Sequence, residues 1–285
     1  MIKTMVFIDG MWLYRNTPKL GEKFGSAEFH VDYGKLPLVL SSQVGAHLSV
    51  PTLDTVRTYL FASYPKNYDV TDEDVVQRQL DFFAMLKEEF HYEVELFPIN
   101  FRGRHIRRED RSPTDKFEPE EKCVDVALAT AMLYFAAIPY AYDVAIAVIG
   151  DRDYMPVLQH VRRLGKRVGI ASIKGACASE YSVAEDTAKL RDMDIIWLDD
   201  VLDQIVLRFE RQLLECQDPR HRGDRKVWTT FRPRRGRPFY CDACRKRNAE
   251  DRPKQKRRLW PQILRLRATR ETNLLPYPTL VSPGL

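Results

Sequence analysis

The stretch between Asp143 and Ser172 limits most strongly how this chain can fold, because two short apolar runs flank a helical pattern. Val144–Ile149 is entirely apolar, which is typical of a strand buried on both faces of a parallel sheet. Apolar residues at helical spacing follow as far as Gly165, and Val168–Ser172 then predicts the next strand. We therefore expect a strand–helix–strand unit here.

Two acids follow the first of these strands directly, in the sequence Gly150-Asp151-Arg152-Asp153. Open α/β sheets bind their ligands beyond the carboxyl ends of the strands, where Asp151 and Asp153 are expected. Neighbouring carboxylates repel each other unless a cation lies between them, and oxygen ligands suit Mg²⁺ or Mn²⁺. The alternative is that Asp151 caps the following helix and Asp153 is a solvated acid of its first turn.

Six strands are predicted in all, and helical patterns lie between them. The predicted strands are Met5–Asp9, Leu53–Ser63, Tyr92–Ile99, Val144–Ile149, Val168–Ser172 and Asp194–Leu198. This alternation predicts the α/β class with a doubly wound parallel sheet. Further helices are expected over Glu118–Ala137 and, at the end of the sheet domain, over Val201–Leu214.

Charge is distributed unevenly along the 285 residues. Residues 218–285 hold 19 Lys and Arg against 6 Asp and Glu, whereas residues 1–217 hold 26 against 34. We expect a domain over residues 1–205, followed over 206–285 by the end of a helix and a basic C-terminal extension. An acidic body with a basic extension indicates a polyanionic partner.

The composition also bears on the cellular setting. No apolar run of about 18 residues is present, so neither a transmembrane helix nor a membrane partner is expected. The five cysteines are odd in number and scattered, which does not indicate a disulfide framework. We expect a reducing, cytoplasmic location. The oligomeric state stays open, and a homo-oligomer is compatible with the sequence.

Arginines supply two candidate surfaces for phosphate. Aromatic residues are interleaved with the basic ones of the extension, a combination that suits RNA, and its candidate contacts include Arg234, Arg235 and Arg237. A second group is expected on an exposed loop, either solvated or lining the acidic site. It comprises Arg102, Arg104, Arg107, Arg108 and Arg111, with Arg152 between the two acids.

Cys241 and Cys244 form half of a possible zinc site in the extension. Cys216 and His221 could complete it, but Cys-x₄-His followed by Cys-x₂-Cys is not a usual zinc spacing. The sequence therefore favours an extension without zinc, and a zinc ion at these residues would be structural.

Two further acids are expected to join Asp151 and Asp153. Asp9 ends the first strand, and Asp125 lies near the start of a helix. The chain contains neither a Walker-type Gly-Lys-Ser/Thr nor a Gly-x-Gly-x-x-Gly motif, and no Ser/His/Asp set stands out. The four carboxylates thus predict a divalent-metal site whose activated water attacks a phosphodiester.

Three segments resemble the motifs of NYN domains, the LabA-like members of the PIN-like nuclease superfamily. The segments are Phe7–Gly10, Lys122–Leu128 and Ile149–Pro156, the last followed by Leu164–Val168. The resemblance covers about residues 1–205 and implies a Rossmann-like α/β/α sandwich. It also implies an endoribonuclease dependent on Mg²⁺ or Mn²⁺, with Asp9, Asp125, Asp151 and Asp153 on the family's acidic positions.

One position departs from the family pattern. NYN domains usually carry Asn three residues after the first Asp, and this chain has Trp12 there. The departure favours an alternative, an RNA-binding or adaptor protein that keeps the fold without turnover. A phosphatase on a similar sheet is a third reading, although Asp9-Gly10-Met11 lacks the Asp-x-Asp that haloacid-dehalogenase-type enzymes carry after the first strand.

Overall fold

The computed structural model describes residues 1–25, 29–182, 190–208, 212–229, 231, 233 and 238–250. Arg234, Arg235 and Arg237 lie outside these residues. The chain divides into two compact units, Met1–Arg208 and Phe209–Leu285.

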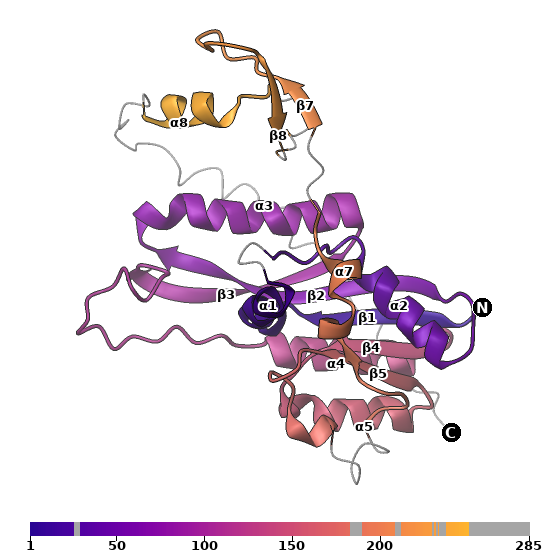
Figure 1. Cartoon of the computed structure of the whole chain (residues 1–285). Helices are drawn as coiled ribbons and strands as arrows, with labels where there is room; N and C mark the ends of the chain where they lie inside the picture. Colours follow the sequence, from indigo (N-terminus) through magenta and orange to yellow (C-terminus); the bar gives the residue numbers. More distant parts are fainter. Residues whose placement is uncertain are drawn as a thin grey trace, which may run out of the picture. The chain divides into compact units, whose positions relative to one another are not determined.

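The first unit is built on a six-stranded sheet in which every neighbouring pair of strands is parallel. Its strands are β1 (Lys3–Asp9), β2 (Asp54–Tyr68), β3 (Glu93–Arg104), β4 (Val144–Val148), β5 (Arg167–Ser172) and β6 (Ile196–Trp197). Their order across the sheet is β3-β2-β1-β4-β5-β6 (Figure 1). The chain thus winds outward from β1 in one direction and from β4 in the other, which confirms the predicted doubly wound sheet.

Helices cover both faces of this sheet (Figure 1). They are α1 (Gly10–Phe24), α2 (Leu36–His47), α3 (Glu73–Phe90), α4 (Val124–Ala137), α5 (Met155–Arg163) and α7 (Leu202–Ile205). Single 3₁₀ turns are η1 (Val70–Asp72), η2 (Arg152–Tyr154), η3 (Ser179–Tyr181) and η4 (Leu198–Asp200). Within the described residues, no helix has the length and apolarity that a membrane span requires.

Side-chain alternation along the strands separates two hydrophobic layers. Val6 and Ile8 of β1 pack with α1, α2, α3 and α7, whereas Met5 and Phe7 pack with α4 and α5. β4 is buried along its whole length, as its apolar sequence predicts. The result is an α/β/α sandwich with the sheet as its middle layer.

The helix expected over Val201–Leu214 is mostly absent from the structure. α7 ends at Ile205, and Val206 forms an antiparallel bridge with Val31. The Ile205 carbonyl accepts from the backbone N–H of Asp32, and Leu207 N–H donates to the His30 carbonyl. These backbone bonds to residues 30–32 replace helical ones, so the prediction that residue 206 continues a helix is wrong.

The arginine-rich segment is also more ordered than predicted. β2 and β3 pair as far as Tyr68 and Arg104, so Arg102 and Arg104 belong to a strand and not to a loop. Arg111 is buried in the following loop, where its guanidinium donates to the carbonyls of His105, Ile106 and Phe117.

The expected helix over Glu118–Ala137 begins only at Val124.

The second unit contains a two-stranded antiparallel sheet and one helix. β7 (Gln212–Glu215) pairs with β8 (Lys226–Thr229), and α8 spans Asp242–Glu250. Its buried cluster consists of Phe239 and three cysteines, Cys216, Cys241 and Cys244.

Candidate active site

Asp9 lies at the point where the sheet changes its winding direction. It ends β1 between β2 and β4, and it is the N-cap of α1. One carboxylate oxygen accepts from the backbone N–H of Trp12 at 2.9 Å, and only 3% of the residue is exposed. Gly10 permits the abrupt strand-to-helix turn, because a Cβ there would lie 2.9 Å from the carbonyl oxygen of Phe61. The neighbouring strand therefore fixes where this carboxylate lies.

Tyr154 connects Asp9 to Asp125. Its buried hydroxyl lies 2.9 Å from Asp9 Oδ2 and 2.7 Å from Asp125 Oδ1. Asp125 stands in the first turn of α4 and is exposed. A tyrosine hydroxyl has one proton, so it cannot donate fully to two ionised carboxylates. Both carboxylates can be fully hydrogen-bonded here only when one of them is protonated. When both are ionised, a bound cation would neutralise their charge.

Asp151 and Asp153 stand on the exposed side of the same edge. Asp151 follows β4 and occupies the N-cap position of η2, yet its side chain makes no capping hydrogen bond to the described residues. Its backbone carbonyl accepts from the Tyr181 hydroxyl at 2.5 Å, which holds the main chain at this turn. The capping bond that the alternative assigns to Asp151 is therefore missing among the described residues, whereas Asp153 is an exposed acid of the first turn, as that alternative expects.

The carboxylates influence one another's ionisation. Burial raises the pKa of Asp9, and the charges of Asp125 and Asp151 add to the rise, against hydrogen bonds from Trp12 and Tyr154 that lower it. Burial likewise raises the pKa of Asp151, with further contributions from Asp125 and Asp153 and an opposing one from Arg15. The negative charges are thus close enough to disfavour one another when no cation is bound.

Two charged residues that sequence reasoning did not assign also belong to this cluster. Glu121 is half-buried, and its pKa is raised by burial first and also by the charges of Asp9 and Asp125. Arg15 of α1 pairs with it at 3.0 Å. Glu121 directly precedes the Lys122–Leu128 motif, which was the only signal available for it. No sequence pattern pointed to Arg15, because only the tertiary structure brings α1 close to the segment before α4.

Trp12 does not present a polar side-chain atom to the acids. It is buried, and its indole Nε1 donates to the carbonyl of Ala176 at 3.2 Å. A Cβ on Gly150 would lie 2.1 Å from this nitrogen, so the indole packs directly on the backbone that precedes Asp151. Trp12 thus supports the turn that carries Asp151, and it does so by packing.

The arginines of the β3 strand and its following loop are partly engaged with their own surroundings. Arg104 pairs with Asp115 at 2.9 Å and lies over the Phe117 ring, which Arg102 also faces at 5.4 Å. Arg108 lies 3.9 Å from Glu118. These contacts fold the segment after β3 around the Phe117 ring. We call this segment, with the end of β3, the arm.

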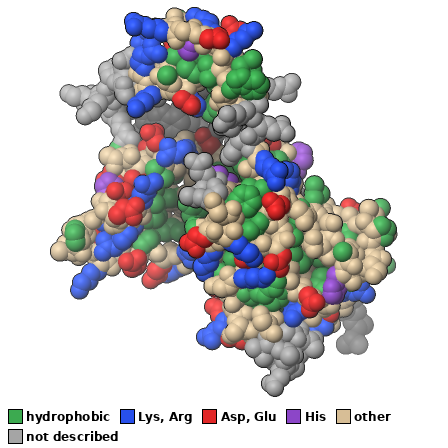
Figure 2. Space-filling model, viewed as in Figure 1, with side chains coloured by type: hydrophobic (Ala, Val, Ile, Leu, Met, Phe, Trp, Pro, Cys, Tyr) green, Lys and Arg blue, Asp and Glu red, His purple; other side chains and the backbone are tan. Residues whose placement is uncertain are grey.

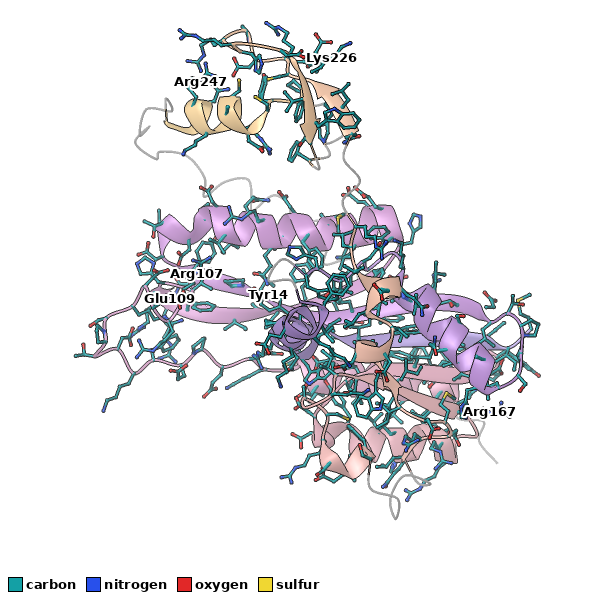
Figure 3. The ribbon with its side chains drawn as sticks, in the orientation of Figure 1. Tyr14, Arg107, Glu109, Arg167, Lys226 and Arg247 are labelled. Carbon is teal, nitrogen blue, oxygen red and sulfur yellow. The ribbon has the colours of Figure 1, made fainter. Side chains whose placement is uncertain are left out.

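Two arginines are more open to solvent. Arg107 is exposed on the loop that follows β3 and is labelled in Figure 3. Arg152, between Asp151 and Asp153, is exposed, with a long 3.9 Å contact to Glu180. These two side chains can approach a ligand without first leaving a short ion pair.

Cys241 and Cys244 lie together with Cys216 and His221 in the second unit, and the four ligand atoms are all within 4.8 Å of one another. Across the described residues, this is the one group of three or more His, Cys, Asp or Glu side chains so placed. The aspartates of the first unit are gathered less tightly.

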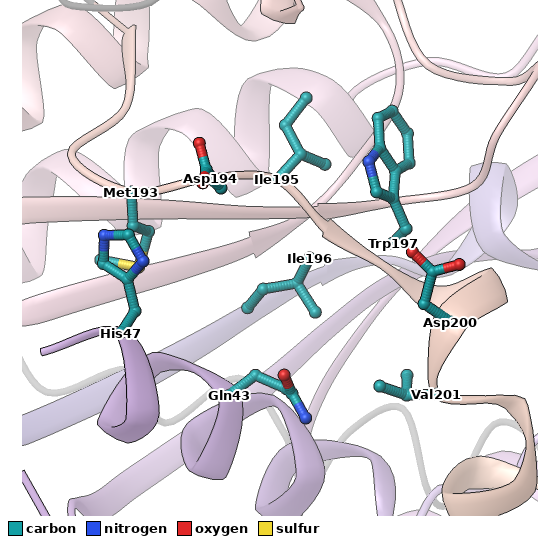
Figure 4. A pocket seen from close by; sticks show the side chains of 9 residues that line it. All are labelled: Gln43, His47, Met193, Asp194, Ile195, Ile196, Trp197, Asp200 and Val201. Carbon is teal, nitrogen blue, oxygen red and sulfur yellow. The ribbon is translucent and has the colours of Figure 1, made fainter. Parts of the chain in front are cut away.

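A pocket lies elsewhere in the first unit, beside β6. It is lined by Gln43 and His47 of α2 and by residues between Met193 and Val201 (Figure 4). None of the four predicted acids lines it, so the candidate site is separate from this pocket.

Comparison with known protein families adds an independent finding. The family model of the NYN domain matches residues 3–189, which include all four aspartates. Searches of curated proteins and of solved structures returned no match.

The packing of Trp12 generates a stability prediction. Trp12→Ala should lower the free energy of unfolding by about 3–5 kcal/mol, the usual cost of removing a large buried aromatic side chain. Urea unfolding followed by far-UV circular dichroism measures this loss. Tyr14→Ala on the same helix is the matched control, because Tyr14 is 75% exposed and should change stability by less than about 0.5 kcal/mol. Equal effects of the two variants would contradict the packing role.

The shared hydroxyl proton generates a second prediction. Asn at position 9 can accept from Trp12 N–H and donate to the Tyr154 oxygen, which frees the hydroxyl proton for Asp125. The pKa of Asp9 is higher in the folded protein than in the unfolded chain. The metal-free fold therefore loses stability as pH rises from the unfolded-state pKa to the folded-state pKa, because the unfolded chain releases this proton more readily. Asp9→Asn removes this loss.

In buffer freed of divalent ions, the melting temperature of Asp9→Asn relative to the unmodified protein should therefore rise from acidic to neutral pH. Adding Mn²⁺ should stabilise the unmodified protein and leave the variant unchanged. If the difference in melting temperature between the two proteins does not change with pH, ionisation of Asp9 does not destabilise the fold, and the prediction is wrong.

Proposed function

The chain belongs to the NYN domain family, and from this premise we propose that it is a metal-dependent endoribonuclease that hydrolyses RNA phosphodiester bonds. NYN domains are generally nucleases, which sets the reaction class. The observation that carries the proposal is the hydroxyl of Tyr154 between Asp9 and Asp125 at the switch point of the sheet. That position is where open α/β sheets bind their ligands.

The donor set fits Mg²⁺ or Mn²⁺. Hard divalent cations prefer carboxylate and water oxygens, and this edge of the sheet offers several carboxylates. Asp9 is buried with a raised pKa, and a single hydroxyl proton serves two carboxylates. A cation would offset both the repulsion and the missing proton. We infer that Asp9, Asp125 and Asp151 would hold it.

The roles of the protein's own residues follow from their surroundings. When bound, a divalent ion lowers the pKa of water and stabilises the charge that develops on phosphate. Tyr154 fixes the positions of Asp9 and Asp125, and the backbone bond from Tyr181 fixes the turn of Asp151. Asp153 is exposed beside Asp151, where it can complete the metal shell or orient the attacking water.

RNA would be held by arginine side chains. In the first unit, exposed Arg152 and Arg107 supply positive charge, and Arg102, Arg104 and Arg108 lie on the neighbouring arm around Phe117. Arg234, Arg235 and Arg237 in the basic extension would add contacts to the backbone. Phosphate contacts of this kind supply affinity without selecting a sequence.

A second candidate function rests on Trp12. Its side chain bonds to Ala176 and covers Gly150, so it offers no ligand where the family usually has Asn. An RNA-binding or adaptor protein with an intact fold and no turnover would show this substitution. Cleavage assays with both metals separate the two functions.

Replacement of Asp151 tests the catalytic proposal. Asp151→Asn keeps the size of the side chain and removes one anionic ligand, so cleavage of labelled single-stranded RNA with Mn²⁺ should fall at least about a hundredfold, a loss of several kcal/mol of transition-state stabilisation. The melting temperature of the metal-free protein should stay equal or rise slightly, because one repelling charge is gone.

Asp54→Asn is the matched control, since exposed Asp54 begins β2 at the opposite edge of the sheet. It should cleave like the unmodified protein. Full activity in Asp151→Asn would contradict the catalytic assignment. An unmodified protein that binds RNA but cleaves none with Mg²⁺ or Mn²⁺ would support the adaptor function instead.

The extension generates a prediction about affinity. In the full chain, the triple change Arg234→Ala, Arg235→Ala and Arg237→Ala should weaken RNA binding and make the slope of log K against log salt shallower by about 2, since three phosphate contacts to a single strand are lost. Arg163→Ala with Arg167→Ala is the control, because Arg167 begins β5 at the amino end of the sheet (Figure 3). An unchanged slope in the triple variant would remove the extension from the RNA-binding surface.

A further inference from the structure

Four potential metal ligands converge in the second unit, outside the part of the chain that matches the NYN family. The ligand atoms of Cys216, His221, Cys241 and Cys244 all lie within 4.8 Å of one another. His221 Nδ1 is 3.3 Å from Cys244 Sγ and 3.5 Å from Cys241 Sγ. Tetrahedral zinc, with bonds of about 2.3 Å to sulfur and about 2.0 Å to nitrogen, places its ligand atoms roughly 3.5–3.8 Å apart. The two imidazole–sulfur distances are close to this spacing, and the 4.8 Å bound on the whole group exceeds it by about 1 Å.

The ligands come from two separate pieces of chain. Cys216 directly follows β7, and His221 lies in the connection between β7 and β8. Cys241 precedes α8, and Cys244 lies in its first turn. Two residues between paired ligands are usual in structural zinc sites. The four residues between Cys216 and His221 made the sequence appear unsuitable, but the connection between the strands brings the imidazole back to the thiols.

The tautomer of His221 suits a metal ligand. Its Nε2 lies 3.0 Å from the carbonyl oxygen of Asp224. A carbonyl can only accept a hydrogen bond, so Nε2 carries a proton, and Nδ1, which faces the thiols, is the nitrogen left for a metal ion. A backbone carbonyl that orients the second ring nitrogen is the usual support for a metal-bound histidine.

Two of the sulfur atoms also accept hydrogen bonds within the unit. The backbone N–H of Cys241 donates to Cys216 Sγ at 3.3 Å. The Arg247 guanidinium donates to Cys244 Sγ at 3.4 Å. Sulfur that ligates zinc commonly accepts such outer hydrogen bonds, so both contacts are compatible with ligation.

The described part of this unit buries little apolar surface. Among the described residues, its buried cluster contains Phe239 and the three cysteines, with Leu214, Val227 and Tyr240 packed beside them. Folded units with so small a core usually need disulfides or a metal in addition. All three cysteines are free, so no disulfide closes this unit within its described residues.

We propose that Cys216, His221, Cys241 and Cys244 form a structural zinc site that fixes the β7–β8 hairpin to the start of α8. Zinc binding contributes directly to the folding free energy of such a unit. The hairpin then displays Trp228, which is 65% exposed, with Lys226 on the same strand. Figure 2 shows Lys and Arg side chains around this unit, and Figure 3 marks Lys226 and Arg247.

The metal content of the full-length protein tests the proposal. Protein purified without chelator should contain one equivalent of zinc by plasma mass spectrometry. Replacement by Co²⁺ should give the intense visible bands of a tetrahedral ion and a sulfur-to-cobalt charge-transfer band. Cys241→Ser and Cys244→Ser should each lose the equivalent, whereas Cys123→Ser and Cys177→Ser, at cysteines outside the cluster, should retain it.

His221 offers a rescue that separates ligation from packing. His221→Ala should lose zinc, and His221→Cys should keep it with a cobalt spectrum shifted toward four thiolates. Asp9→Asn and Asp151→Asn should both retain the zinc, which distinguishes this site from the carboxylates of the first unit whether or not the chain cleaves RNA.

Two results would overturn the site. One is unmodified protein from zinc-supplemented growth that holds less than a tenth of an equivalent and gives no tetrahedral Co²⁺ spectrum. The other is unchanged zinc content in Cys244→Ser. Should the cysteine variants fail to fold, the cobalt spectrum of the unmodified chain still decides between thiolate ligation and its absence.

Discussion

The parallel pairing of β1 with β4 is the constraint on which the rest of the first unit depends. β1 and β4 are the strands from which the chain winds in opposite directions, so no crossover helix covers the edge between their carboxyl ends. The two strands are buried on both faces, so neither can shift its register without exposing apolar side chains. Asp9 and Asp151 are consequently held close together by the core itself.

The cost of this arrangement is visible in the carboxylates. Burial and mutual repulsion raise the pKa of both Asp9 and Asp151, and the hydroxyl of Tyr154 has one proton for two acceptors. A site built only for stability would not contain such a conflict, because a neutral amide at position 9 would resolve it. Conflicts of this kind gather where a ligand supplies the missing charge.

The two units reach stability by different physical means. The first buries two continuous hydrophobic layers against a six-stranded sheet, which is ample for a domain of its length. The second has little to bury among its described residues, and three of its buried side chains are thiols that converge with an imidazole. On both proposals the chain would bind two kinds of metal ion. Carboxylates of the first unit would select Mg²⁺ or Mn²⁺, and thiolates of the second unit would select zinc.

The sequence by itself determined the sheet, its six strands and the acids at their carboxyl ends, because buried parallel strands leave continuous apolar runs that end where ligands bind. It could not determine how Tyr154 joins Asp9 to Asp125, that Arg15 reaches Glu121, or that Trp12 packs on Gly150. Each of these contacts joins residues far apart in the chain, and local patterns carry no information about such pairs. The same reason explains two errors: residues 206–207 pair with residues 30–31 instead of extending a helix, and Arg102 and Arg104 follow β2 into the sheet. His221 likewise meets the three cysteines only because the fold of the second unit returns it to them.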